Sequence, residues 1–184
     1  MEQTELPPDS PHRRLPTGLL AAGATAVLAI VLLTVALSGK PTMPPQIGEP
    51  VPEFKLTAFD GSSMDIGAQN GKVVVVNFYA SWCDPCRQEA ADLAQAWRDF
   101  QSRDVQFFGI GYKDASARAR AFLTEFGATY PATADIGNRT ARAYGVTGVP
   151  ETFIVDREGR LVRHILGPIS QTELAHELDQ LLSP

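Results

Sequence analysis

The chain has 184 residues, a length that allows one domain of ordinary size together with a terminal extension. Its formal net charge is −5, and no basic patch or run of alternating basic and aromatic residues is present. Because proteins that bind nucleic acid carry such basic patches, nucleic acid is not an expected partner. The chain holds only two cysteines, Cys83 and Cys86, so any thiol chemistry must use this pair.

Residues 1–38 are predicted to form a cytoplasmic stub and a transmembrane anchor. Residues 19–37 contain no charged side chain and are rich in Leu, Ala and Val. A helix of that length spans about 28 Å, close to the hydrocarbon thickness of a bilayer. Arg13 and Arg14 precede the helix, and only Lys40 follows closely. Since positive residues stay in the cytoplasm, we expect a single-pass protein of the cell (inner) membrane whose main domain is periplasmic or otherwise extracytoplasmic.

A cleaved signal peptide is the alternative for this segment, because Ala36 and Ser38 are small residues at positions that a signal peptidase recognises. Signal-peptide apolar cores usually run about 7–15 residues. The apolar run here is longer, which favours an uncleaved anchor. Residues 39–50 are rich in proline and are predicted to be an extended linker. Residues 51–184 then form a domain large enough to bury its own core.

The first predicted elements of this domain are a short hairpin and a buried strand. Residues 54–57 and 64–66 are predicted strands around the turn sequence Asp60-Gly61. Residues 73–79 form a continuous apolar run rich in valine, typical of a strand that is covered on both faces. A helix is expected next, over 84–100, where apolar residues recur at the spacing of one helix face, at Ala90, Leu93, Ala94 and Trp97.

The later elements complete the order β-α-β-α, then a β-hairpin, then α. Ser170-Gln171-Thr172-Glu173 is a capping box, in which serine and glutamate side chains satisfy backbone donors at a helix start. It therefore marks the beginning of the last helix. The intervening elements are predicted as a strand over 105–110, a helix over 115–126, a helical turn around 138–144, and strands over 152–155 and 161–166.

The sequence Trp82-Cys83-Asp84-Pro85-Cys86 lies between the buried strand and the start of a helix. A Cys-x-x-Cys pair in this position is typical of a redox-active disulfide. The helix N-terminus favours the thiolate of Cys83, so we expect Cys83 to be the exposed attacking thiol and Cys86 the resolving thiol. A structural zinc site is the alternative. Zinc needs four ligands, and the chain offers no second cysteine pair, so no metal is expected.

Two acidic residues near these cysteines allow more than one interpretation. Asp84 at a helix start stabilises the helix, and the same charge close to Cys83 would alter the redox properties of the pair. Glu151 alone would be a solvated loop acid. Pro150, at the start of a predicted strand, requires no functional explanation by itself. His164 is interpreted as a strand residue without a catalytic role.

Three segments together resemble the TlpA-like thioredoxins. They are residues 73–86, the Gly-Tyr-Lys-Asp sequence at 111–114 and the sequence from Tyr144 to Phe153. Within that family the chain is most similar to the membrane-anchored thiol–disulfide reductases of cytochrome c maturation, of the DsbE/CcmG and ResA type. The resemblance covers nearly all of residues 50–184. It departs from the family pattern after Glu89, where Ala90-Ala91 replaces a common x-Pro.

The resemblance implies a thioredoxin-like α/β fold with a central mixed sheet flanked by helices. It also implies a cis peptide bond before Pro150 and a substrate groove formed by Trp82, Pro85, Val149 and Pro150. Glu151 would lie near the cysteines. Because Asn77 stands where plain thioredoxins carry a buried acid, Glu151 becomes the candidate for proton transfer to Cys86.

The function implied is reduction of disulfides in apocytochrome c, directly or through a thiol carrier protein, before haem attachment. The domain would be reduced again by a membrane thiol transporter of the DsbD/CcdA type. No cofactor is expected. A general reductant or oxidant of exported proteins is an alternative. A thioredoxin-fold copper chaperone is an alternative of a different class, because two thiolates can bind Cu(I).

Overall fold

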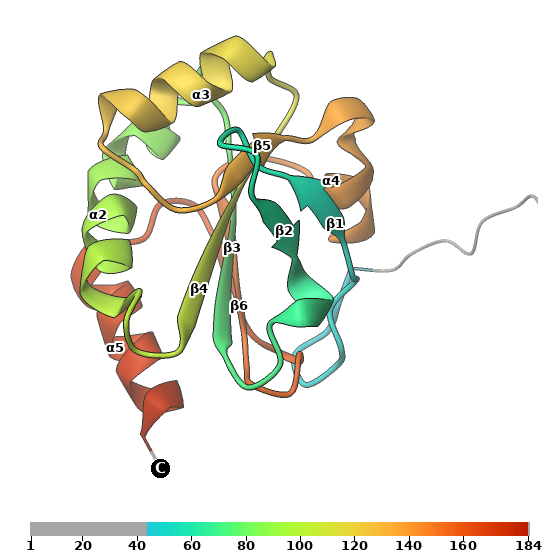
Figure 1. Ribbon diagram of the computed structural model, residues 1–184, viewed down its shortest axis with the longest axis vertical. Coiled ribbons are helices and arrows are strands. Elements are labelled where there is room, and N and C mark those ends of the chain that lie inside the picture. Colours follow the sequence, from blue (N-terminus) through green and yellow to red (C-terminus); the bar gives the residue numbers. More distant parts are fainter. Residues whose placement is uncertain (1–43, 184) are drawn as a thin grey trace, which may run out of the picture. The chain divides into compact units, whose positions relative to one another are not determined.

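A five-stranded mixed sheet forms the centre of the computed structural model, which describes residues 44–183 (Figure 1). Its strand order is β5-β4-β3-β6-β7, with β4 and β5 parallel to β3, and β6 antiparallel to β3 and to β7. The strands are β3 (Val73–Tyr79), β4 (Val105–Gly111), β5 (Ala132–Ala134), β6 (Glu151–Val155) and β7 (Leu161–Leu166).

Within residues 44–183, a separate antiparallel hairpin and six helical segments surround this sheet. The hairpin pairs β1 (Lys55–Thr57) with β2 (Ser63–Asp65). The helices are α2 (Asp84–Phe100), α3 (Ser116–Glu125), α4 (Arg139–Ala143) and α5 (Gln171–Leu182), and the 3₁₀ segments are η1 (Ile66–Ala68) and η2 (Ile136–Asn138). The Ser170 capping box opens α5 as predicted.

Two apolar cores lie on opposite faces of the sheet because successive side chains of a strand point to opposite sides. Val73 and Val75 of β3 pack with residues of α2, α3 and α5. Val74 and Val76 pack with the β1–β2 hairpin, with Tyr144 and with α4. All seven residues of β3 are buried, as the valine-rich run predicted. The segment 82–86, which contains both cysteines, therefore follows closely after a strand that is packed on both faces.

The sequence analysis missed only one strand among the described residues, the edge strand β5. Its sequence is Ala132-Thr133-Ala134, which is short and has neither β-branched nor aromatic enrichment. It pairs with the end of β4, with Gly109 opposite Ala132 and Gly111 opposite Ala134. Pairing with a neighbouring strand, which the local sequence does not encode, produces this element.

The last part of the predicted linker, residues 44–50, is hydrogen-bonded to the folded domain. The Gly48 N–H donates to the Leu161 carbonyl, and the Leu161 N–H donates to the Glu49 carbonyl. Pro50 forms an isolated bridge with Arg160. The many prolines predicted an extended backbone, but the sequence did not reveal that this backbone forms hydrogen bonds with the start of β7.

The predicted membrane segment, residues 19–37, lies outside the described residues, as do the stub and residues 39–43 of the linker. Within residues 44–183, none of the helices has the length and apolar character needed to cross a membrane.

Candidate active site

Cys83 and Cys86 are joined by a disulfide at the N-terminus of α2. Cys83 is the N-cap residue, and its Sγ accepts a hydrogen bond from the Cys86 backbone N–H at 3.1 Å. Pro85 occupies the first turn, where a missing N–H costs no intrahelical hydrogen bond. The Cys86 N–H and the positive end of the helix dipole therefore face the sulfur of Cys83, which favours its thiolate when the disulfide is reduced.

Cys83 is less exposed than the sequence analysis expected. Its exposed fraction is 4%, against 1% for Cys86, so the prediction of an openly exposed attacking thiol is wrong for this oxidised state. The reason is the neighbouring loop, since the Val149 carbonyl oxygen lies 3.4 Å from the Cys83 sulfur. A disulfide sulfur carries no proton, so this is a packing contact here. A reduced Cys83 thiol could donate a hydrogen bond to the same oxygen.

The loop that covers Cys83 contains the predicted cis-proline. The Val149–Pro150 peptide bond is cis, as the resemblance implied. Pro150 is buried and Val149 is half-buried. The Pro150 carbonyl accepts a hydrogen bond from the Gly167 N–H, just beyond β7. Because β6 is antiparallel to β3, its first residues lie beside the last residues of β3, and this arrangement brings residues 149–150 to the disulfide.

Glu151, the first residue of β6, is a buried acid with a full set of hydrogen bonds. Its exposed fraction is 4%. Oε1 accepts from the backbone N–H groups of Thr147 and Gly148, at 3.0 and 3.1 Å. Oε2 lies 2.8 Å from His164 Nε2. Glu151 thus holds the loop that leads to Pro150, and the contact with His164 was not expected from sequence.

Glu89 is a second buried acid near the cysteines, and the sequence analysis assigned it no role. It lies one helical turn after Cys86 and is 2% exposed. Burial raises its pKa from the usual 4.5 to about 7, against the opposing effect of hydrogen bonds from the Asn77 side chain and the Ile169 backbone. This carboxyl group therefore holds its proton to a much higher pH than an ordinary glutamate. The sequence could have indicated that Glu89 is buried, because it lies on the same predicted helix face as Cys86 and Leu93.

Asn77 connects Glu89 to the strand that carries Glu151. Its Nδ2 donates to Glu89 Oε1 at 2.9 Å and to Thr152 Oγ1 at 3.0 Å. The second carboxylate oxygen, Oε2, accepts from the Ile169 N–H at 3.0 Å. Plain thioredoxins carry an acid at the position of Asn77. Here the Asn77 amide donates a hydrogen bond to an acid on α2, Glu89.

Trp82 is held by the Gly-Tyr-Lys-Asp segment that the sequence analysis singled out. Its Nε1–H donates to the Lys113 carbonyl at 3.2 Å, although the residue is 55% exposed. Asp114 Oδ2 accepts from the Ser81 N–H at 2.7 Å, and Oδ1 accepts from Ala115. Burial alone would raise the Asp114 pKa, but these hydrogen bonds outweigh it and leave the pKa lowered. The segment 113–114 thus positions the residues just before Cys83.

The remaining predicted site residues are at the surface. Asp84 and Pro85 are exposed in the first turn of α2. Asp84 lies where a negative charge stabilises the helix, and its effect on the redox pair stays a prediction. Among residues 44–183, no group of three or more His, Cys, Asp and Glu side chains is arranged to hold a metal ion.

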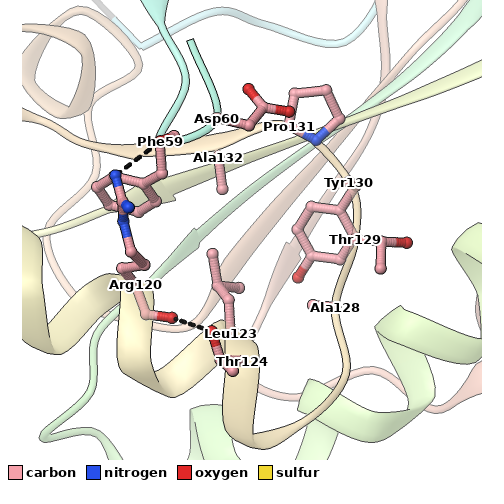
Figure 2. Close-up of a pocket in the computed structure, with 10 residues that line it drawn as sticks. All are labelled: Phe59, Asp60, Arg120, Leu123, Thr124, Ala128, Thr129, Tyr130, Pro131 and Ala132. Carbon is pink, nitrogen blue, oxygen red and sulfur yellow. Dashed lines mark hydrogen bonds between the residues drawn. The ribbon is translucent and has the colours of Figure 1, made fainter. Parts of the chain in front are cut away.

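A cavity of about 170 Å³ lies elsewhere in the domain, and neither cysteine lines it. Figure 2 shows the residues that line it. It is lined by the start of the β1–β2 turn, by α3 and by the segment that enters β5. Arg120 closes one side, since its Nη2 donates to the Phe59 carbonyl at 2.6 Å. No predicted site residue lines this cavity.

A thioredoxin-like sheet, a disulfide at a helix N-terminus and a cis-proline beside it define a thiol–disulfide oxidoreductase. The comparisons with known proteins agree. The model of the AhpC/TSA family matches residues 47–164, and the chain belongs to this family.

Similar proteins are named for thiol–disulfide exchange. The thiol:disulfide interchange protein HelX of Rhodobacter capsulatus is 39% identical over 120 residues, which are 65% of this chain and 66% of HelX. The thiol:disulfide interchange protein DsbE of Allochromatium vinosum is 32% identical over 86% of this chain and 87% of its own. A crystal structure of a thioredoxin-family thiol:disulfide interchange protein from Chlorobium tepidum has a TM-score of 0.68 and 28% identity, and covers 77% of this chain and 98% of its own.

Proposed function

We propose that this chain is a membrane-tethered, extracytoplasmic reductase that keeps the haem-attachment cysteines of apocytochrome c in the thiol form. The observation that carries the proposal is the Cys83–Cys86 disulfide at the start of α2, next to the Gly-Val-Pro-Glu-Thr-Phe segment of the cytochrome c maturation reductases. The uncharged run 19–37, with Arg13 and Arg14 before it, supports an inner-membrane anchor with the cytoplasm on its N-terminal side.

In the proposed reaction, two electrons pass from the reduced cysteine pair to the substrate disulfide. The Cys83 thiolate attacks one substrate sulfur, the substrate S–S bond breaks, and a mixed disulfide forms while a substrate thiolate leaves and takes a proton. The Cys86 thiolate then attacks the Cys83 sulfur and releases the second substrate thiolate. The Cys83–Cys86 disulfide remains, and a membrane thiol transporter of the DsbD/CcdA type must reduce it again.

The second step requires that Cys86 lose its proton inside the protein. Glu151 is the acceptor that the family resemblance suggested, but it takes part in three hydrogen bonds, with Thr147, Gly148 and His164, whereas Glu89 takes part in two. Glu89 is the better candidate. It is buried on the helix face of Cys86, and its pKa of about 7 leaves an ionised fraction at neutral pH. A base is most effective when its pKa is near the working pH.

The reduction potential of the Cys83–Cys86 pair is the first test, measured by equilibration with glutathione or dithiothreitol. A value near about −270 mV supports a reductant, whereas about −120 mV would identify a disulfide donor and overturn the cytochrome assignment. The Cys86→Ser variant should then accumulate a mixed disulfide with an oxidised apocytochrome c, and Cys83→Ser should not. Equal capture of unrelated oxidised proteins would indicate a general reductant instead.

A further inference from the structure

We propose that His164 is a positioning residue for the disulfide chemistry, because through Glu151 it holds the loop 147–150 against Cys83. His164 lies on β7, an edge strand, and among the described residues its side chain is hydrogen-bonded to Glu151 and not to either cysteine. The proposal rests on the thiol–disulfide activity of the family and not on apocytochrome c as the substrate.

An unbroken series of contacts joins the imidazole to the reactive sulfur. His164 Nε2 lies 2.8 Å from Glu151 Oε2. Glu151 Oε1 accepts hydrogen bonds from the backbone N–H groups of Thr147 and Gly148. The next residue, Val149, places its carbonyl oxygen 3.4 Å from Cys83 Sγ. A displacement of the Glu151 side chain would therefore move the backbone that faces the sulfur.

Glu151 needs the histidine because it is almost fully removed from water. A buried carboxylate must have hydrogen-bond donors for both oxygens, or it becomes costly to keep in place. The loop N–H groups satisfy Oε1. Within residues 44–183, His164 is the only partner of Oε2. Without it, Oε2 would be drawn toward solvent and Oε1 would leave the loop.

The imidazole is itself held in one orientation by its neighbour on β6. Phe153 is directly opposite His164 in the strand register, and their rings stack with centroids 4.1 Å apart and planes at 15°. Phe153 is fully buried and also packs against Phe78 and Tyr144. The His164 side chain is 29% exposed. The ring therefore connects a rigid core to a loop of the active site.

Two substitutions separate the hydrogen bond from the stacking. His164→Gln keeps a donor near the position of Nε2 but loses the aromatic ring, and His164→Leu keeps apolar packing but loses the donor. We expect His164→Leu to speed alkylation of reduced Cys83 by iodoacetamide several-fold, since the covering carbonyl withdraws. We also expect it to raise the KM for a peptide with a Cys-x-x-Cys disulfide more than it lowers kcat. His164→Gln should restore both values.

The control is His176→Gln, which removes an exposed histidine on α5 that bonds only Gln180 among the described residues. If His164→Leu does not fold, His164→Asn replaces it, because its amide is one methylene too short to reach Glu151. If His164→Leu has the same rate of Cys83 alkylation and the same KM as the wild type, the proposal is overturned. A defect in His164→Gln as large as in His164→Leu would also overturn it, because packing on Phe153 would then be the whole role. Alkylation needs no substrate protein, so failure here is distinct from failure of the apocytochrome assignment.

Discussion

Replacing Glu89 by glutamine should change how the stability of the protein depends on pH. The glutamine has the same shape but cannot ionise, and its single oxygen replaces one of the two oxygens that accept from Asn77 and from Ile169. The variant therefore removes the proton equilibrium of a buried acid while it keeps most of the packing around α2.

The sign and size of the effect follow from the raised pKa of Glu89, which moves from 4.5 to about 7 on folding. Between these values the folded protein binds a proton that the unfolded chain has lost, so stability falls as the pH rises. A shift of this size corresponds to about 3 kcal/mol. The favourable effect is complete below the unfolded pKa and is lost once the pH passes the folded pKa.

Urea unfolding of the oxidised protein between pH 4.5 and pH 8 measures this dependence. The wild type should lose about 3 kcal/mol more than Glu89→Gln across that range. Glu158→Gln, which removes an exposed glutamate in the β6–β7 turn, controls for the loss of a surface carboxylate. Parallel pH profiles for the wild type and Glu89→Gln would refute the conclusion that Glu89 folds as a protonated acid near pH 6.

Three further substitutions test other parts of the domain. Asp114→Ala should lower the free energy of unfolding by about 2 kcal/mol in urea titrations at pH 7, because the Ser81 N–H loses its acceptor. Since the Asp114 pKa is lowered from its ordinary value of 3.8, this difference should begin to shrink below that pH and continue to shrink as the pH falls through the lowered pKa of the folded state. Tyr144→Phe should raise the free energy of unfolding by about 1 kcal/mol, because the buried hydroxyl has no partner among the described residues. The melting temperature should rise accordingly. Gly145→Ala should cost about 2 kcal/mol, since φ is 69° and a Cβ would overlap the Pro44 ring. Calorimetry showing no loss for the last variant would contradict that packing.

The sequence predicted most of the fold because its signals are local. The valine run gives β3, the apolar spacing gives α2 and the capping box gives α5, each with the bounds or start that the structure has. The strand β5 lacks such a signal, because it exists through pairing with β4. The attachment of residues 44–50 to the start of β7 is likewise a contact between distant segments.

The same distinction applies to the active site. The cysteines were evident from their spacing and from the elements that flank them, and the cis-proline followed from the family resemblance. Glu89 was missed because an acid in a helix is usually exposed, and its burial depends on Asn77 and Ile169, which are far away in the chain. The contact of His164 with Glu151 depends on the register of β6 against β7, which no local pattern reveals.

The order and direction of the strands bring the ends of several elements to the same edge of the sheet as the cysteine pair. The last residues of β3, β4, β5 and β7 and the first residue of β6 lie along one edge of the sheet. Three large apolar side chains on that edge are exposed, namely Trp82, Ile136 and Leu166. The disulfide lies at the same edge of the sheet as these exposed apolar side chains. A polypeptide that covered this edge would bury them, so substitutions in the surrounding loops would change its affinity without altering the cysteine pair.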